Sequence, residues 1–227
     1  MLLLNIGNTH TQIAQSDGSA VGAVRVIPTG EVTPALIAGE TAAVASVVPA
    51  VSARLRAPGV FFLDVSMAAA CGLDLSHVDA STLGMDRLAN AIELTSRGLP
   101  AAALDAGTAL TLEYVDAARV FRGGAIAPGR RMMRRSLAEG TAQLPEIALA
   151  ETAPEAPGRD TASAIRFGVD RGIVGMAAAW LAALPEGVKV YAVGGDAPFF
   201  LRVLPALVPG GEDFTLRGLL TAWRTCR

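Results

Sequence analysis

Near its start the chain reads Leu4-Asn5-Ile6-Gly7-Asn8-Thr9-His10-Thr11, and one hundred residues later it reads Leu104-Asp105-Ala106-Gly107-Thr108-Ala109-Leu110-Thr111. Both stretches lead from an apolar strand through Asn or Asp, one spacer and a glycine into small residues, most of them polar. Each then continues as a second strand, at residues 12–14 and 112–115. Two strands joined by a glycine turn are typical of a β-hairpin. The repeat therefore predicts one such hairpin at the start of each half of the chain.

A second repeated pattern supports the duplication. Residues 42–49 are typical of a strand that ends in a turn, and a helical stretch follows at 50–56. Residues 188–196 and 198–204 repeat this order of strand, turn and helix. Two different patterns that each occur twice, in the same order, indicate two lobes of related structure.

Helices are expected between these repeated patterns, at residues 86–96 in the first half and 162–184 in the second. Alternating strands and helices are typical of an α/β fold. We therefore predict an N-terminal lobe at residues 1–100 and a C-terminal lobe at residues 101–227, with a cleft between them.

The glycine hairpins suit the binding of phosphate groups. Backbone N–H groups around a glycine can approach phosphate oxygens closely because no Cβ intervenes. An acid just before such a turn can hold a cation that bridges phosphates. The turn at Gly194-Gly195 would let an adenine and its ribose lie against the backbone. A single glycine turn is most often an ordinary tight turn, but two copies together favour a nucleotide clamp.

The composition excludes several other classes of protein. Hydrophobic residues make up 52% of the chain and the net charge is −2, which gives no general attraction to nucleic acid or to acidic membranes. The first residues contain no basic leader, and no apolar run approaches the roughly 20 residues of a membrane span. The two cysteines, Cys71 and Cys226, form no motif and suit a reducing compartment. We therefore expect a cytoplasmic protein with no membrane association.

Two common kinds of nucleotide enzyme are also excluded. P-loop enzymes and protein kinases need a lysine that pairs with phosphate groups. Lys189 is the only lysine in the chain, and it lies at the start of a predicted strand rather than after a glycine loop. A nucleotide must therefore be held by backbone amides, arginines and metal ions.

The motifs together resemble the type III pantothenate kinases and their Bvg accessory factor relatives, in the acetate and sugar kinase/Hsp70/actin superfamily. Blocks in the order of that family span nearly the whole chain. They are Asn5–His10, Ser46–Pro49, Gly84–Arg87, Asp105–Ala109, Gly123–Gly129, Gly140–Pro145, Gly158–Thr161, Gly194–Asp196 and Leu216–Leu219.

This resemblance implies an actin-like, ribonuclease H-like ATPase fold and a reaction. ATP and pantothenate would give 4′-phosphopantothenate, the first step of coenzyme A biosynthesis, in a homodimer that uses Mg²⁺ and a monovalent cation, K⁺ or NH₄⁺. It also implies a role for particular residues. Asp86 matches the proton acceptor and Asp105 the monovalent-cation ligand. The ATP contacts match Asn5, Ile6, Gly7, Asn8, Thr9, His10, Thr11, Gln12 and Thr108, and the pantothenate contacts match Gly84, Met85, Asp86, Arg87 and Thr161.

The residue chemistry agrees with the role of Asp86. A primary alcohol is a poor nucleophile, and a nearby carboxylate can accept its proton during phosphoryl transfer. A simpler interpretation also exists, because Asp in the first turn of a helix is stabilised by the helix dipole alone.

The chain departs from the family at Asn5, where an aspartate is usual. Asn keeps an oxygen ligand but loses the negative charge that Mg²⁺ prefers. The chain also lacks the tyrosine that the family often places before Gly84. Two alternatives therefore stand beside an active pantothenate kinase. One is a catalytically impaired homologue with a ligand-binding or regulatory role, and the other is a kinase of the same fold for another small alcohol.

A basic cluster follows Gly129, formed by Arg130, Arg131, Arg134 and Arg135. Arginines at these spacings share much of one helix face. Without interleaved aromatic residues, such a cluster is more typical of a solvated or interface face than of a nucleic-acid site. We therefore expect no nucleic-acid partner.

Overall fold

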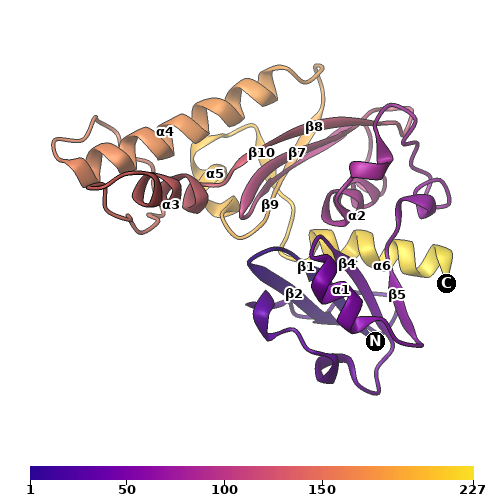
Figure 1. Ribbon diagram of the computed structural model, residues 1–227. Coiled ribbons are helices and arrows are strands. Elements are labelled where there is room, and N and C mark those ends of the chain that lie inside the picture. Colours follow the sequence, from indigo (N-terminus) through magenta and orange to yellow (C-terminus); the bar gives the residue numbers. More distant parts are fainter. The chain divides into compact units, whose positions relative to one another are not determined.

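The computed structural model describes residues 1–227, which form two five-stranded sheets and six α-helices (Figure 1). The predicted α/β class is confirmed. Contacts divide the chain into two compact units. Unit 1 contains Met1–Ala101, Glu113–Gly123 and Gly211–Arg227, and unit 2 contains Ala102–Leu112 and Gly124–Gly210. The units alternate along the chain, whereas a boundary at residue 100 would give two consecutive segments; that lobe division stays a prediction.

The first sheet belongs to unit 1 and has the strand order β3-β2-β1-β4-β5. Its strands are β1 (Leu2–Ile6), β2 (His10–Gln15), β3 (Arg25–Pro28), β4 (Ala42–Ser46) and β5 (Val60–Phe62). Strands β1, β2 and β3 pair antiparallel, and β1, β4 and β5 pair parallel. The antiparallel β1–β2 pair confirms the first predicted hairpin.

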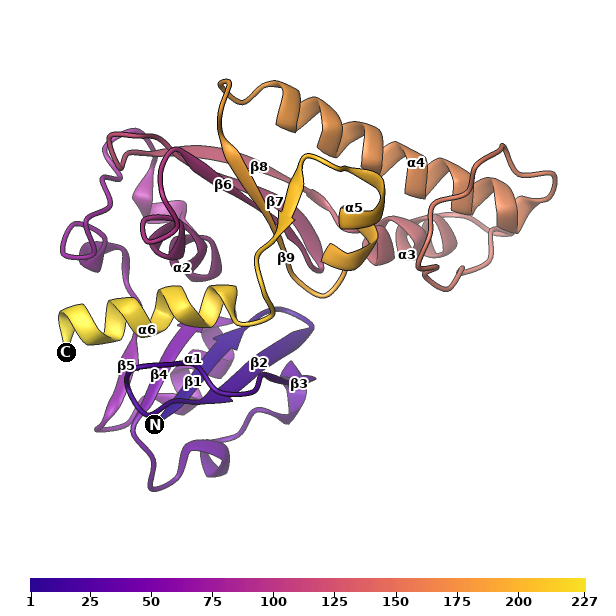
Figure 2. The ribbon, with the colours of Figure 1, turned by 180° about the vertical axis from the view of Figure 1, so that it is seen from behind.

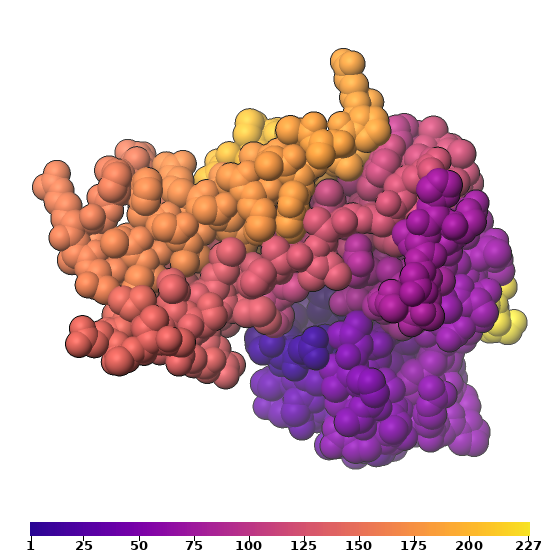
Figure 3. Space-filling model, turned by 45° about the horizontal axis from the view of Figure 1, so that its top comes forward, coloured from indigo at the N-terminus to yellow at the C-terminus, as the bar shows by residue number.

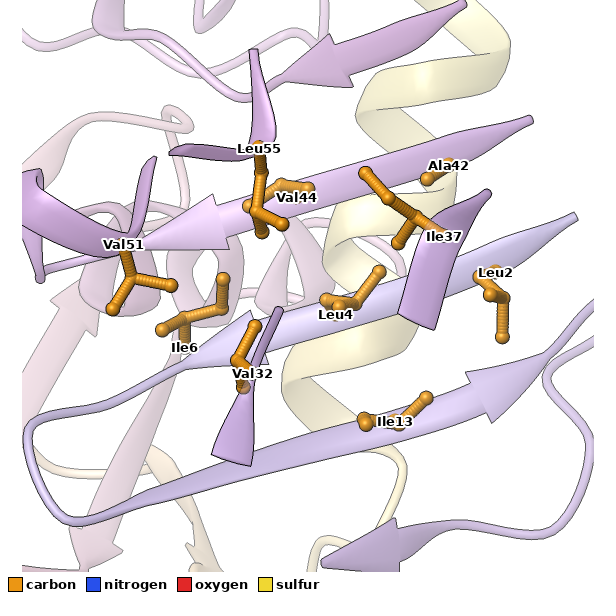
Figure 4. Packing of buried hydrophobic residues seen from close by; sticks show 10 residues of the cluster. All are labelled: Leu2, Leu4, Ile6, Ile13, Val32, Ile37, Ala42, Val44, Val51 and Leu55. Carbon is orange, nitrogen blue, oxygen red and sulfur yellow. The ribbon is translucent and has the colours of Figure 1, made fainter. Parts of the chain in front are cut away.

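Alternation along β1 separates the two faces of this sheet. Leu2, Leu4 and Ile6 point to one face, where they pack in an apolar cluster (Figure 4). The cluster also contains Ile13, Val32, Ile37, Ala42, Val44, Val51 and Leu55. Helix α1 (Pro49–Leu55) contributes the last two of these residues. The intervening residues Leu3 and Asn5 point to the other face, because successive side chains of a strand alternate.

That other face is covered by the last helix of the chain, α6 (Phe214–Cys226), which contacts β1, β4 and α2 (Met85–Leu94). Figures 1 and 2 both show α2 and α6 side by side. The two helices approach closely because Gly218 has no side chain: a Cβ there would lie 1.8 Å from the carbonyl oxygen of Ala89. The buried residues of α6 thereby complete the core of unit 1.

The second sheet has the order β10-β9-β6-β7-β8. Its strands are β6 (Ala101–Ala106), β7 (Ala109–Val115), β8 (Phe121–Pro128), β9 (Lys189–Val193) and β10 (Leu207–Pro209). Adjacent β6 and β7 confirm the second predicted hairpin, although the residues at the far end of β7 and the start of β8 group with unit 1.

Three helices belong to unit 2: α3 (Arg130–Gly140), α4 (Thr161–Ala182) and α5 (Ala197–Val203). Helix α5 packs on β9 and β10, and α3 packs against α4. In the space-filling view of Figure 3, the salmon atoms of α3 lie below the orange atoms of α4. None of the helices, including α4 with its 22 residues, is both long and apolar enough to cross a membrane.

Candidate active site

The turn of the first hairpin, at residues 7–9, is held by hydrogen bonds from Thr29. The Gly7 N–H donates to the carbonyl oxygen of His10 (3.1 Å), which closes the turn. Thr29 donates its N–H to the Thr9 carbonyl (3.0 Å) and its hydroxyl to the Gly7 carbonyl (2.7 Å). Asn8, Thr9 and His10 are exposed. Hydrogen bonds thus support the turn while its polar residues Asn8, Thr9 and His10 face solvent.

Two residues of the predicted phosphate loop point into unit 1 instead. Ile6 is fully buried in the apolar cluster. Thr11 is also fully buried, and its hydroxyl lies 3.0 Å from the hydroxyl of Thr29. Their side chains therefore support the hairpin, and their assignment as nucleotide contacts stays a prediction that would involve the backbone.

Asn5 and Gln12 face each other across the base of this hairpin. They are register partners, and Asn5 Nδ2 donates to Gln12 Oε1 (3.0 Å). Asn5 Oδ1 is buried and has no hydrogen-bond partner. A neutral amide oxygen of this kind fits a hard cation such as Mg²⁺. No group of three or more His, Cys, Asp or Glu side chains is placed to hold a metal ion.

Asp86 lies in the first turn of α2, directly after Gly84 at the N-cap and Met85. Its Oδ1 accepts a hydrogen bond from the Arg87 N–H (2.7 Å). A Cβ at Gly84 would lie only 2.7 Å from that same oxygen, so the glycine makes room for the carboxylate. Burial raises the pKa of Asp86, and the Arg87 N–H and charge oppose this shift. The carboxylate is thus a stronger base than an exposed aspartate.

The end of β4 links the hairpin to Asp86. Val47 donates its N–H to the carbonyl oxygen of Ile6 (3.1 Å). The Val47 Cγ1 atom also lies 3.4 Å from the position that a Cβ at Gly84 would take. Three of the blocks that the sequence singled out, at residues 5–12, 46–49 and 84–87, therefore meet within unit 1.

A buried polar network holds Arg87. Its Nε donates to Glu113 Oε1 (2.9 Å), and Asn90 Nδ2 donates to Glu113 Oε2 (3.4 Å). The Thr215 hydroxyl in turn donates to Asn90 Oδ1 (2.8 Å). Glu113 and Asn90 are fully buried. The network joins α2, β7 and α6 and fixes the side chain that follows Asp86.

The second hairpin, in unit 2, is packed against two further glycine turns. A Cβ at Gly194 would lie 2.4 Å from Asp105 Oδ1 and 2.6 Å from the Ala106 carbonyl oxygen, and Gly194 has a φ of +86°. A Cβ at Gly129 would lie 2.4 Å from the Gly107 carbonyl oxygen. Gly194 is therefore required by its contact with Asp105. Its neighbour Gly195 faces open space, with nothing within 4 Å of a Cβ.

Thr108 lies at the tip of this second hairpin. Its side chain is exposed, and its carbonyl oxygen accepts a hydrogen bond from the Gly129 N–H (3.0 Å). Unit 2 thus brings together Asp105, Thr108 and the turn at residues 194–196, because the Asp196 N–H donates to the Ala106 carbonyl (2.9 Å).

Thr161 lies elsewhere in unit 2, at the first position of α4. It is exposed and follows Asp160, whose side chain and that of Ser163 form a capping box. None of the hydrogen bonds described above joins Thr161 to the second hairpin.

The basic cluster on α3 corrects the expectation of a solvated or interface face. Arg131 and Arg135 are exposed, but Arg130 and Arg134 are buried. Asp170 Oδ1 of α4 accepts from Arg130 Nε (3.1 Å) and Arg134 Nη2 (2.6 Å). Burying a charge is costly unless it is paired, so these two arginines serve the α3–α4 packing.

Arg130 also reaches the turn after β9. Its Nη1 donates to Asp196 Oδ1 (2.8 Å), and its guanidinium carbon lies 3.4 Å from the centre of the Phe199 ring. Burial raises the pKa of Asp196, while the Arg130 charge opposes this shift. Arg130 thereby anchors the turn that packs against Asp105.

A surface hollow of about 640 Å³ in unit 1 is lined by parts of residues 65–80 and by Ala118 and Arg119. It shares no residue with the hairpin at residues 5–12 or with residues 84–87.

Comparison with known proteins places the chain in a family. The model of the type III pantothenate kinase family matches residues 1–183. A type III pantothenate kinase from Rubrobacter xylanophilus is 31% identical, over 96% of this chain and 95% of its own length. The chain belongs to the type III pantothenate kinase family. The family resemblance expected from the sequence blocks is thus confirmed.

Solved structures with little sequence identity share the fold of this family member. A protein from Campylobacter jejuni, described as a Baf family transcriptional activator, superimposes with a TM-score of 0.67 over 98% of this chain and 96% of its own, at 18% identity. A protein from Sinorhizobium meliloti, assigned as a 2-dehydro-3-deoxygalactonokinase, superimposes with a TM-score of 0.60 over 99% and 96%, at 13% identity.

Sequence reasoning missed two residues that support the candidate site of this pantothenate kinase family member. Thr29 supports the first turn, and Glu113 holds Arg87. Glu113 had one visible signal, because it is the only charged residue in the strand at 109–115. A charge in such a strand needs a buried partner. The spacing of the residues did not indicate which arginine that partner would be.

Proposed function

We propose that the protein transfers the γ-phosphoryl group of ATP to the primary hydroxyl of pantothenate, giving 4′-phosphopantothenate. The observation that carries this proposal is the Asp86 carboxylate, which occupies the space left by Gly84 at the start of α2 in a chain of the pantothenate kinase family. This activity is the entry step of coenzyme A biosynthesis.

Asp86 is the proposed proton acceptor. Phosphoryl transfer needs little covalent chemistry from the protein, so positioning and charge stabilisation supply most of the catalysis. The raised pKa of Asp86 makes its carboxylate a better base for a hydroxyl proton. Its hydrogen bond from the Arg87 N–H holds one oxygen in place, and Arg87 is in turn held by Glu113.

The nucleotide and the cations are assigned to the two glycine hairpins. ATP would contact the loop at residues 5–12 and Thr108, and Mg²⁺ bound to ATP would supply positive charge at the phosphates. Asn5 Oδ1 would face that ion, and Asp105 would hold K⁺ or NH₄⁺. Pantothenate would contact Thr161 and residues 84–87. We further propose that the protein is a homodimer and acts in the cytoplasm.

A coupled assay tests this function. Purified protein with ATP, Mg²⁺, K⁺ and pantothenate should release ADP, with no release when pantothenate is omitted. Calorimetry on the same sample should show that ATP binds. Binding of ATP without turnover on pantothenate would instead favour the impaired homologue, and turnover on another small alcohol alone would change the substrate.

A further inference from the structure

The amide of Asn5 is oriented by a short relay that ends on the backbone. Asn5 Nδ2 donates to Gln12 Oε1 (3.0 Å), and Gln12 Nε2 donates to the carbonyl oxygen of Glu212 (3.2 Å). Asn5 and Gln12 are register partners on adjacent strands, so both side chains lie on the same face of the sheet. Glu212 precedes α6, which covers that face. All three residues belong to unit 1.

The Glu212 carbonyl determines the direction of every hydrogen bond in this relay. A carbonyl oxygen can only accept, so Gln12 must turn its nitrogen toward it. Gln12 then presents its oxygen to Asn5, and because this oxygen can only accept, Asn5 must donate through its own nitrogen. Asn5 Oδ1 is consequently left on the other side of the amide, where it is buried without a partner. A buried oxygen without a partner is costly, which indicates that something absent from the relay uses it.

We propose that Gln12 is a positioning residue that presents Asn5 Oδ1, rather than Nδ2, to the cation that accompanies the nucleotide phosphates. This inference rests on the proposed kinase function. The reverse amide orientation would point N–H groups at a cation and repel it. A carboxylate has two equivalent oxygens and needs no such orientation. The relay therefore compensates for the amide at position 5, and its importance depends on that amide.

A double-mutant cycle tests this dependence. The variants are Gln12→Leu, Asn5→Asp and the two combined, and the measurement is ATP affinity by calorimetry with Mg²⁺ and with EDTA. Gln12→Leu should weaken binding of Mg²⁺–ATP by about tenfold when Asn5 is present. It should have little effect together with Asn5→Asp, and little effect on either protein in EDTA.

Two further variants separate orientation from packing. Gln15→Leu makes the same change at an exposed position of the same strand and should leave all affinities unchanged. Gln12→Glu can still accept from Asn5 Nδ2 but cannot donate to Glu212. It should therefore not weaken Mg²⁺–ATP binding, even if thermal unfolding shows a less stable protein.

Three results would overturn the inference. The first is an equal loss of affinity from Gln12→Leu with Asn5 and with Asn5→Asp. The second is the same loss in EDTA, which would show that Gln12 only supports the hairpin. The third is weakening by Gln12→Glu as large as that by Gln12→Leu. By contrast, absence of any ATP binding by the unmodified protein would contradict the kinase function itself.

Discussion

Among single residues, Asp86 both lowers the stability of the fold and is the proposed proton acceptor of the reaction. Burial raises its pKa because the charged form loses water, and the Arg87 N–H and charge only partly offset this. The folded protein therefore holds a proton on Asp86 more tightly than the unfolded chain does. Stability is lost as the pH rises from the ordinary pKa of 3.8 through the raised value. At neutral pH the carboxylate is a partly buried charge that destabilises unit 1.

Asp86→Asn should separate these two effects. The amide keeps an oxygen that can accept from the Arg87 N–H but cannot take a proton from the substrate, so kcat should fall by about a hundredfold or more. The variant should also unfold at a higher temperature at pH 7, and the difference should narrow as the pH falls toward 4. Kinetics with thermal unfolding across pH checks both. Activity close to that of the unmodified protein would remove Asp86 from the mechanism.

Thr161 is the second residue that a single substitution can test. Thr161→Val keeps the shape of the side chain and removes its hydroxyl. Loss of one hydrogen bond to pantothenate should cost about 1 kcal/mol, which is a severalfold rise in KM for pantothenate at unchanged KM for ATP. Thr225→Val, at an exposed position in α6, is the matched control. Equal KM values for the two variants would contradict the assignment.

Among whole elements, two glycine turns make room for the two carboxylates of the candidate site. Gly84 makes room for Asp86 at the start of α2, and Gly194 makes room for Asp105 beside the second hairpin. Both glycines would place a Cβ within 2.7 Å of a carboxylate oxygen. The two turns differ in backbone conformation, since only Gly194 has a positive φ.

Gly84→Ala should therefore displace the Asp86 carboxylate while α2 still forms, because the φ of −65° at this position suits alanine. A shift of about 1 Å in a reacting group can lower the rate by about a hundredfold. We expect a fall in kcat with little change in unfolding temperature. Gly172→Ala, at an open position in α4, should keep full activity and stabilise its helix by about 1 kcal/mol. Full activity of Gly84→Ala would show that the carboxylate tolerates displacement.

Gly194→Ala and Gly195→Ala form a contrasting pair in the turn after β9. The first places a Cβ against Asp105 at a positive φ and should lower the unfolding temperature. The second places a Cβ in open space and should leave that temperature unchanged, while weakening ATP binding if the adenine lies against this turn. Thermal unfolding and ATP titration on both variants separate these effects. Unchanged ATP affinity in Gly195→Ala would place the adenine elsewhere.

For the molecule as a whole, the last segment of the chain is needed to complete the first unit. Leu216, Leu219 and Ala222 of α6 are fully buried, and α6 covers one face of the sheet that the first residues form. Thr215 also ends the network that holds Arg87 through Asn90 and Glu113. The chain ends therefore depend on each other for folding.

Deletion of residues 211–227 should consequently unfold unit 1. It would expose the apolar face of β1 and β4 to water and leave the buried Asn90 and Glu113 without part of their network. We expect insoluble protein, or loss of the cooperative unfolding transition by circular dichroism. Deletion of Arg227 alone should have no such effect, because that residue is exposed. A stable, cooperative protein ending at residue 210 would contradict this dependence.

The local features of this protein follow from the sequence by itself. The two hairpins, the strand alternation and the helices near residues 86–96 and 162–184 depend on glycine turns and on periodicity, which neighbouring residues determine. The order of short blocks along the chain was enough to predict the family. Asp86 and Asn5 could be singled out because each stands at a fixed place in one such block.

Only the tertiary structure decided which distant residues meet. The sequence predicted Arg130 and Arg134 on a solvated face, but in the fold both pair with Asp170. Arg87 likewise pairs with Glu113, which is distant in the sequence. The sequence also did not predict that Asp105 packs against Gly194. Nor did it predict that Gln12 and Glu212 orient Asn5. The physical reason is that the residues next to a charged or amide side chain in the sequence do not show which distant residue it will pair with. That partner is chosen by packing and by the need to satisfy buried polar groups across the whole fold.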